Sequence, residues 1–294
     1  MYCGFLILVH KNPEQVNILI NQLLSDENNY IYVHISKDFR EKIIDNLIFH
    51  PRVKILNESI KIEWSNDGIL KAQLCLLNIA LADGMDYFCF LTGQDLLIKK
   101  DINDYLRNHK DEIFINSMIS KKEAKIRLEY YWKPIFLKLY DNKLNPIRIL
   151  RRLRIELAKM GFPLKKKKTN KNIQKNIIYY KSYFWCAFPR NVGSYILNEL
   201  KKNAYYKDLF FDAMCPEEVF WATLIMNSKY KDRIKTNQTL MYTSEFVNNH
   251  PKIIRYEDID ELKKTEYFFA RKFDINVDSS VIEYYKKLIC EEEI

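Results

Sequence analysis

The feature that most constrains the fold is the alternation of apolar runs with helical patterns in the first ninety residues. Four short runs are apolar or β-branched, as buried strands are: Phe5–Val9, Tyr30–Ile35, Val53–Leu56 and Tyr87–Leu91. Between them, residues 16–23 and 67–82 carry apolar side chains at helical spacing. This order predicts a doubly wound, mostly parallel α/β sheet flanked by helices. Ligands of such sheets bind beyond the carboxyl ends of the strands, so the loops after Val9, Ile35 and Leu91 are candidate site loops.

The rest of the chain continues this pattern after an interruption. The interruption is an irregular, basic, helical insertion, after which a strand is expected at Tyr183–Phe188 and a helix starting at Pro216. We predict a single domain over residues 1–294. Its three parts are a nucleotide-binding half (1–116), the basic insertion (117–176) and an acceptor-binding and catalytic half (177–294).

The formal net charge is +9, and much of the positive excess lies between Lys121 and Lys175. The arginines of this stretch alternate with Leu150, Leu153 and Leu157, which predicts an amphipathic basic helix. Four interpretations are open: a surface for nucleic acid, for anionic lipid or for a phosphate-bearing substrate, or a merely solvated face. The sequence has no recognised nucleic-acid-binding motif, so we expect no nucleic acid partner.

Targeting and cysteine patterns indicate a cytoplasmic protein. No run of 18 apolar residues is present, and Met1–Val9 lacks a basic segment and a cleavage site, so neither a membrane-spanning helix nor a secretory signal is expected. The six cysteines are scattered, without zinc-site spacing. We expect a reducing cytosol, where the basic stretch could hold the protein at the inner face of the cytoplasmic membrane.

Familiar catalytic signatures such as GxGxxG, the P-loop, HExxH and GxSxG are absent from the sequence. Asp258-Ile259-Asp260 matches the DxD string with which many nucleotide-sugar transferases hold a metal ion. Asp258 and Glu261 also have capping-box spacing before Leu262, which favours a helix start over a metal site.

Several motifs together carry a resemblance. They are Phe5–Gln15 (FLILVHKNPEQ), Tyr30–Ser36, Trp64 with Ala72 and Leu76, Leu91–Asp95 (LTGQD), Cys215–Trp221 (CPEEVFW), His250–Lys252 and Phe269–Asp274 (FARKFD). In this order they resemble the core-2/I-branching β-1,6-N-acetylglucosaminyltransferases and the related xylosyltransferases, from residue 5 to residue 274. The resemblance implies a GT-A-like fold and an inverting sugar transfer from a UDP-sugar to a hydroxyl group, with no divalent metal. Residues 117–176 have no secure counterpart.

Inverting transfer needs a base that takes the proton of the acceptor hydroxyl, and cations that neutralise the departing diphosphate. The resemblance gives the role of base to Glu218. A structural alternative is that Glu218 only opposes the helix dipole behind Pro216, a role that Glu217 fits equally well.

The remaining site residues follow from the same resemblance. Donor or nucleotide binding is expected of Val9, His10, Asp95, Lys252, Arg271 and Lys272. Acceptor binding is expected of Ser182, Tyr183, Trp185 and Glu217. The alternatives are ordinary surface charge for Lys252, Arg271 and Lys272, and hydrogen bonds to local backbone groups for His10. For Asp95 the alternative is a turn or capping role, and for the aromatic side chains it is burial.

Two departures from the family pattern affect specificity. Ser36 stands where the family usually has an acid near the nucleotide, and Lys181–Trp185 (KSYFW) replaces a Gly-Ser-x-Trp-like stretch. The donor sugar therefore stays open among GlcNAc, xylose and glucose. The expected acceptor is a glycan or a lipid-linked glycan in surface polysaccharide biosynthesis. A nucleic-acid-binding protein or a peripheral membrane protein without catalysis is the alternative.

Overall fold

The computed structural model describes residues 1–63, 65–138, 140, 142, 144–162, 164–167, 177–247 and 250–290. Trp64 and the end of the basic stretch, 168–176 with Lys168 and Lys175, lie outside the described residues, as does the side chain of His250. The predictions that involve them stay predictions.

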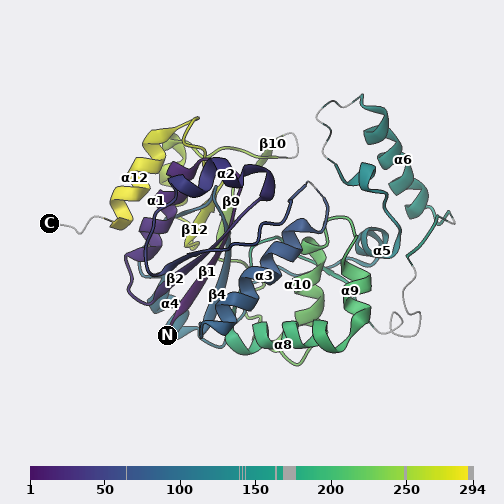
Figure 1. Ribbon diagram of the computed structural model, residues 1–294, viewed down its shortest axis with the longest axis horizontal. Coiled ribbons are helices and arrows are strands. Elements are labelled where there is room, and N and C mark those ends of the chain that lie inside the picture. The colour runs from purple at the N-terminus through teal and green to yellow at the C-terminus, as the bar shows by residue number, and fades with distance from the viewer. Residues whose placement is uncertain are drawn as a thin grey trace.

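A five-stranded sheet in the order β3-β2-β1-β4-β8 forms the centre of the molecule (Figure 1). Its strands are β1 (Cys3–Val9), β2 (Asn29–Ile35), β3 (Val53–Ile55), β4 (Tyr87–Thr92) and β8 (Ala187–Pro189). The first four are parallel, and β8 pairs antiparallel with β4. The predicted α/β class with a mostly parallel sheet is therefore confirmed.

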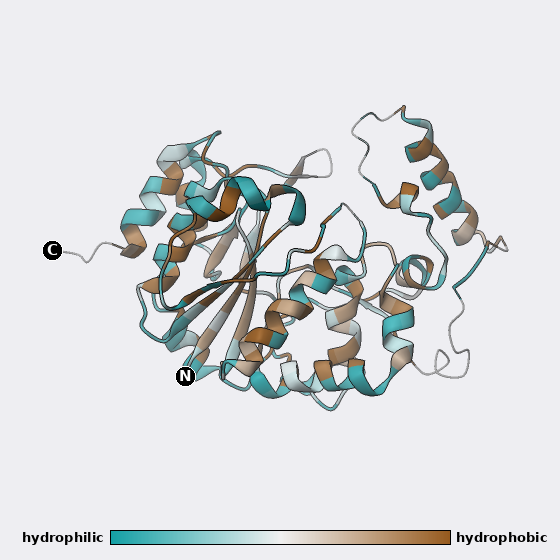
Figure 2. Cartoon of the chain, in the orientation of Figure 1, coloured by the Kyte–Doolittle hydropathy of each residue, from teal (hydrophilic) through white to brown (hydrophobic). Residues whose placement is uncertain are grey.

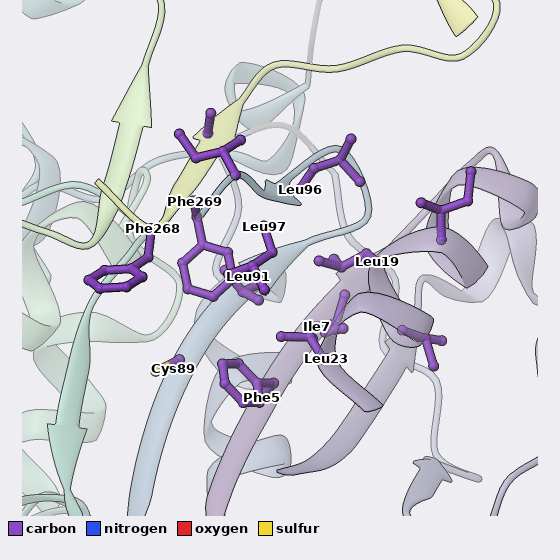
Figure 3. Packing of buried hydrophobic residues seen from close by; sticks show 14 of the residues in the cluster. Phe5, Ile7, Leu19, Leu23, Cys89, Leu91, Leu96, Leu97, Phe268 and Phe269 are labelled. Atoms are coloured by element: carbon purple, nitrogen blue, oxygen red, sulfur yellow. The ribbon is translucent and has the colours of Figure 1, made fainter. Parts of the chain in front are cut away.

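Helices cover both faces of this sheet. Successive side chains of β1 point to opposite faces and belong to two different apolar clusters. Phe5 and Ile7 pack with α1 (Pro13–Leu24) and α12 (Ser279–Cys290) on one face (Figure 3). Leu6 and Leu8 pack on the other face with α3 (Gly68–Ala82), α8 (Arg190–Lys202) and α10 (Glu217–Met226). A strand buried on both faces has no polar position, which is why β1 is apolar throughout.

The other helices are short, apart from α6. They are α2 (Arg40–Ile43), α4 (Ile102–Asn108), α5 (Lys121–Glu129), α6 (Pro146–Lys159), α9 (Ala204–Phe210) and α11 (Ile259–Leu262). The minor strands are β5 (Leu96–Leu97), β6 (Met118–Ile119), β7 (Tyr180–Lys181), β9 (Met241–Thr243), β10 (Phe246–Val247), β11 (His250–Pro251) and β12 (Phe269–Arg271). Strand β12 lies between β5 and β9 in a separate three-stranded sheet.

The insertion contains the amphipathic helix that the sequence predicts, since α6 includes Leu150, Leu153 and Leu157. Helices α5 and α6 share a third apolar cluster that contains Ile126, Trp132, Leu137, Ala158 and Met214. Among the described helices, none is long and apolar enough to cross a bilayer.

The strand predicted at Tyr183–Phe188 is wrong in extent, because β8 begins only at Ala187. The preceding residues bond elsewhere: the Ser182 amide donates to the main-chain oxygen of Glu218 at 2.6 Å, and the Trp185 indole donates to the carboxylate of Asp95 at 2.8 Å. These contacts replace a sheet ladder along the segment.

Candidate active site

Three motifs from distant parts of the sequence meet beyond the carboxyl ends of β1 and β4. Gln15, in the first turn of α1, is fully buried and joins them. Its amide nitrogen donates to the oxygens of Gly93 and Phe273, both at 3.2 Å. Its oxygen accepts from the Ile275 amide at 3.0 Å. The loop after β1, the LTGQD turn and the FARKFD segment are therefore fixed to one another.

Positive charges gather where these motifs meet. Partial burial and then the charges of Lys11, Lys272 and Arg271 lower the pKa of His10 to about 4. Burial and then Lys11 and Arg271 also lower the pKa of Lys272. One acid, Asp274, pairs with Lys11 at 2.6 Å. Cations held this close together favour binding of an anion.

Asp95 lies behind this cationic cluster rather than at its surface, with an exposed fraction of 0%. Its carboxylate accepts from the amide and hydroxyl of Thr92 at 2.7 and 2.8 Å, and from the Trp185 indole at 2.8 Å. The Arg271 Nε lies 3.8 Å from the same carboxylate, and the Arg271 guanidinium stacks 4.0 Å from the centre of the Trp185 ring. Burial raises the pKa of Asp95, and Arg271 opposes the rise. Asp95 thus fixes the positions of Trp185 and Arg271.

The end of β2 adds Ser36, which is buried. Its amide donates to the Val9 oxygen at 2.9 Å, and its hydroxyl accepts from the Ile62 amide at 3.3 Å. The hydroxyl that stands in place of the expected acid therefore bonds to backbone. It connects the carboxyl ends of β1 and β2 to the loop before α3.

Glu218 lies in the first turn of α10, with 35% of its side chain exposed. Its Oε2 is 2.5 Å from Arg127 Nη1 and 3.9 Å from Lys181 Nζ. Arg127, on α5, also contacts Glu123 at 2.6 Å. The sequence analysis missed both Arg127 and Lys181. Arg127 is one cation among many in a stretch with no family counterpart, and only the fold brings it to Glu218.

The neighbouring Glu217 has the opposite surroundings, with 5% exposure and an Oε2 that lacks a hydrogen-bond partner among the described residues. Burial, and then the charge of Glu218, raises the pKa of Glu217 to about 8. Glu217 is therefore mostly neutral at pH 7. Within the described chain, ligand atoms of Cys215, Glu217 and Glu218 lie within 4.8 Å of one another and could hold a cation. The Arg127 guanidinium already neutralises Glu218 there.

The segment Ser182–Trp185 connects the cationic cluster to Glu218. Ser182 bonds to the Glu218 main chain at one end, and Trp185 bonds to Asp95 at the other. Three residues of extended chain span at most about 11 Å, so the backbones of Ser182 and Trp185 are no farther apart than that. Tyr183 stands between them with 45% exposure, whereas Ser182 is buried.

The backbone around Lys252 lies near the cationic cluster, but the amine of Lys252 does not contribute its charge to that cluster. The Ile254 amide donates to the Lys272 oxygen at 2.8 Å, whereas the Lys252 amine pairs with Asp258 at 2.8 Å. Asp258 also accepts from the Arg255 amide at 2.9 Å. The predicted capping box of Asp258 with Glu261 is wrong, because these contacts occupy Asp258 and α11 begins without a side-chain cap.

Comparisons with known proteins show one family and many distantly similar structures, two of which are described below. A family model described as Core-2/I-Branching enzyme matches residues 3–266. A comparison with curated proteins finds no match. One similar structure is a Bacillus anthracis protein described as a glucose-1-phosphate thymidylyltransferase, in complex with sucrose. The two sequences are 12% identical, and the match covers 67% of this chain and 75% of that chain, with a TM-score of 0.30. Another is 4-diphosphocytidyl-2C-methyl-D-erythritol synthase from Anaerococcus prevotii, 10% identical, covering 69% of this chain and 77% of that chain, with a TM-score of 0.34. Neither structure informs the activity of this chain.

Proposed function

Because the chain belongs to the core-2/I-branching enzyme family and is therefore a glycosyltransferase, we propose that it moves a sugar from a UDP-sugar to a glycan or lipid-linked acceptor, with inversion and without a divalent metal. The donor sugar would be GlcNAc, xylose or glucose. The enzyme would act in the cytoplasm, in the synthesis of a surface polysaccharide. The observation that carries this proposal is the short segment Ser182–Trp185, which bonds to the main chain of the ion-paired Glu218 at one end and contacts Asp95 and Arg271 at the other.

In this proposal the donor lies beyond the carboxyl ends of β1 and β4. Val9 and His10 line the nucleoside, and Lys272 and Arg271 hold the diphosphate. Their charges stabilise the leaving group where other transferases use a metal ion. Asp95 positions Arg271 in two ways. Its carboxylate bonds to Trp185, on which Arg271 stacks, and it lies 3.8 Å from the Arg271 guanidinium. Lys252 stands at the rim, with its charge shared with Asp258.

Glu218 would act on the acceptor. As the acceptor oxygen attacks the anomeric carbon, its proton passes to the Glu218 carboxylate. The bond from the anomeric carbon to the phosphate oxygen breaks, and UDP leaves with the electron pair. Arg127 holds the Glu218 carboxylate in position. Tyr183 offers a ring face to the acceptor sugar, and the neutral Glu217 lies at the same end of α10.

The test is Glu218→Gln, with Glu217→Gln as the matched control on the same helix turn. Glutamine cannot accept the proton, so turnover should fall by about 10²–10⁴-fold, while calorimetry with UDP gives an unchanged affinity. Glu217→Gln should keep most of its turnover, because it replaces an already neutral carboxyl group. Near-normal turnover in Glu218→Gln, or equal losses in the two variants, would remove Glu218 from the mechanism.

A further inference from the structure

Among the described residues, helix α6 packs against the body of the protein with one face. Ala158 and Arg151 are buried, and Ile155 packs against the third apolar cluster. Arg151 donates to the main-chain oxygens of Phe136 and Lys138, both at 3.0 Å. Asn145 caps the start of the helix by accepting from two amides of its first turn. The helix is therefore well formed, and in Figure 1 it lies beyond α5, away from the central sheet.

The outward face of α6 carries exposed apolar side chains beside the exposed Arg152, Glu156 and Lys159. Ile149, Leu150 and Leu153 are each about half exposed, at 50%, 52% and 52%, and Met160 follows them with 73%. Spacings of three and four residues place Ile149, Leu150 and Leu153 on one face of the helix. The brown and teal bands of α6 in Figure 2 show this mixture of apolar and polar residues. Soluble proteins seldom leave such a stripe uncovered without a partner for it.

Positive charge accompanies the apolar stripe. Helix α6 carries four arginines and Lys159, against a single acid, Glu156, which pairs with Lys159 at 2.8 Å. Arg154 bonds to a main-chain oxygen, which leaves the charge of its guanidinium in place. Apolar side chains beside a surplus of cations characterise helices that lie in the interface of an anionic bilayer.

We propose that the outward face of α6, defined by Ile149, Leu150, Leu153 and Met160, docks on a membrane of anionic lipids. A second copy of this chain fits the face less well. Two copies meeting through the same face would bring their arginines together, and like charges repel. An anionic membrane satisfies the apolar residues and the cations at once.

The position of α6 gives this docking a consequence for the reaction. Met214 belongs to the cluster under α6, and Cys215 packs against it. The chain then runs directly into Glu217 and Glu218. Docking would therefore place the Glu218 end of the site near the bilayer, where a lipid-linked acceptor lies. This orientation rests on the proposed function, whereas the docking itself does not.

Flotation with vesicles tests the docking. Wild-type protein should float with vesicles of phosphatidylcholine and phosphatidylglycerol, and far less with phosphatidylcholine alone or at high salt. Leu150→Gln/Leu153→Gln should bind the anionic vesicles about tenfold or more weakly, since a buried leucine side chain contributes at least that much. Phe49→Gln is the matched control, because Phe49 is 99% exposed but lies before β3, outside the insertion. It should float like the wild type.

Two further measurements separate the alternatives. Thermal unfolding and UDP binding check that the double variant is folded, and Glu218→Gln should float normally even though it is inactive. Equal flotation of the double variant and the wild type would overturn the proposal, as would equal binding to neutral vesicles. A dimer in gel filtration that the double variant abolishes would assign the face to a second copy instead.

Discussion

The two carboxylates at the centre of the proposed site, Asp95 and Glu218, are held in opposite ways. Asp95 is fully buried and accepts three hydrogen bonds from Thr92 and Trp185. Glu218 is one-third exposed and is held by the guanidinium of Arg127. A buried carboxylate with all its bonds made keeps a fixed geometry, whereas a carboxylate that is one-third exposed and held by ion pairs is less constrained. In the proposed mechanism, the donor end is therefore built before any ligand binds, and the acceptor end is the more adjustable of the two.

The two ends also differ in the parts of the chain that form them. The donor end is made of segments that follow β1 and β4 and of the FARKFD segment, which Gln15 fixes together. The acceptor end depends on α5, because Arg127 comes from the insertion. Variation in the insertion can thus change the acceptor end without disturbing the donor end.

After the loss of turnover expected for Glu218→Gln, the largest expected effect is at the donor end. Lys272→Ala should weaken UDP binding by roughly 1.5–3 kcal/mol, since charge-assisted hydrogen bonds to phosphate are lost. Uridine binding should hardly change, because uridine lacks the phosphates. Lys252→Ala is the control, with a smaller loss expected because Asp258 already neutralises that amine. Calorimetry measures all three proteins. Equal losses for UDP and uridine would show that Lys272 does not face phosphate.

A smaller effect is expected when the acceptor end is loosened. Arg127→Met should lower kcat by roughly tenfold, about 1.4 kcal/mol in barrier, because Glu218 loses the group that positions it. The affinity for UDP should stay normal, and Arg127→Lys should recover part of kcat. A loss of UDP affinity in Arg127→Met would mean that the two ends are not separate.

The dependence of the unfolding free energy on pH tests the raised pKa of Glu217, the buried neighbour of Glu218. The folded pKa of Glu217, about 8, is above its unfolded value, so its stabilising effect is lost as the pH rises toward 8. His10 and His34 have pKa values lowered to about 4, so they change stability only below their ordinary pKa of 6.5. Between pH 6.5 and pH 8, Glu217 should therefore lower the unfolding free energy by up to about 1.4 kcal/mol per pH unit, while Lys167, whose pKa burial lowers to about 8, opposes this fall near pH 8. Urea unfolding of Glu217→Gln should give a flatter profile; parallel profiles would contradict the raised pKa.

The smallest expected effect is that of chelation. UDP affinity measured with EDTA should equal that measured without it, because Lys272 and Arg271 supply the positive charge. Affinity that collapses in EDTA and returns with manganese would instead point to a metal at the diphosphate, and would return Asp258 and Asp260 to consideration.

Local patterns were sufficient for the elements that surround the donor end. The apolar runs of β1, β2 and β4 and the spacing of α1 and α3 are set by burial along short stretches, and a parallel sheet necessarily brings their loops together. The pairing of Arg127 with Glu218 joins residues 91 positions apart and leaves no local trace. The burial of Asp95 could not be predicted either, because the LTGQD motif gives residue types but not the exposed fraction of their side chains. The shortened strand after Tyr183 reflects bonds to Asp95 and Glu218, which are tertiary contacts.

The segment Ser182–Trp185 has a consequence for the shape of the product. In the proposed mechanism, its two anchored ends would set the distance between the donor's anomeric carbon and the base, and so limit which acceptors fit. An acceptor hydroxyl reaches both only if the sugar that bears it fits beside Tyr183. The composition of these four residues would therefore select which hydroxyl of the acceptor is glycosylated, while the donor stays the same.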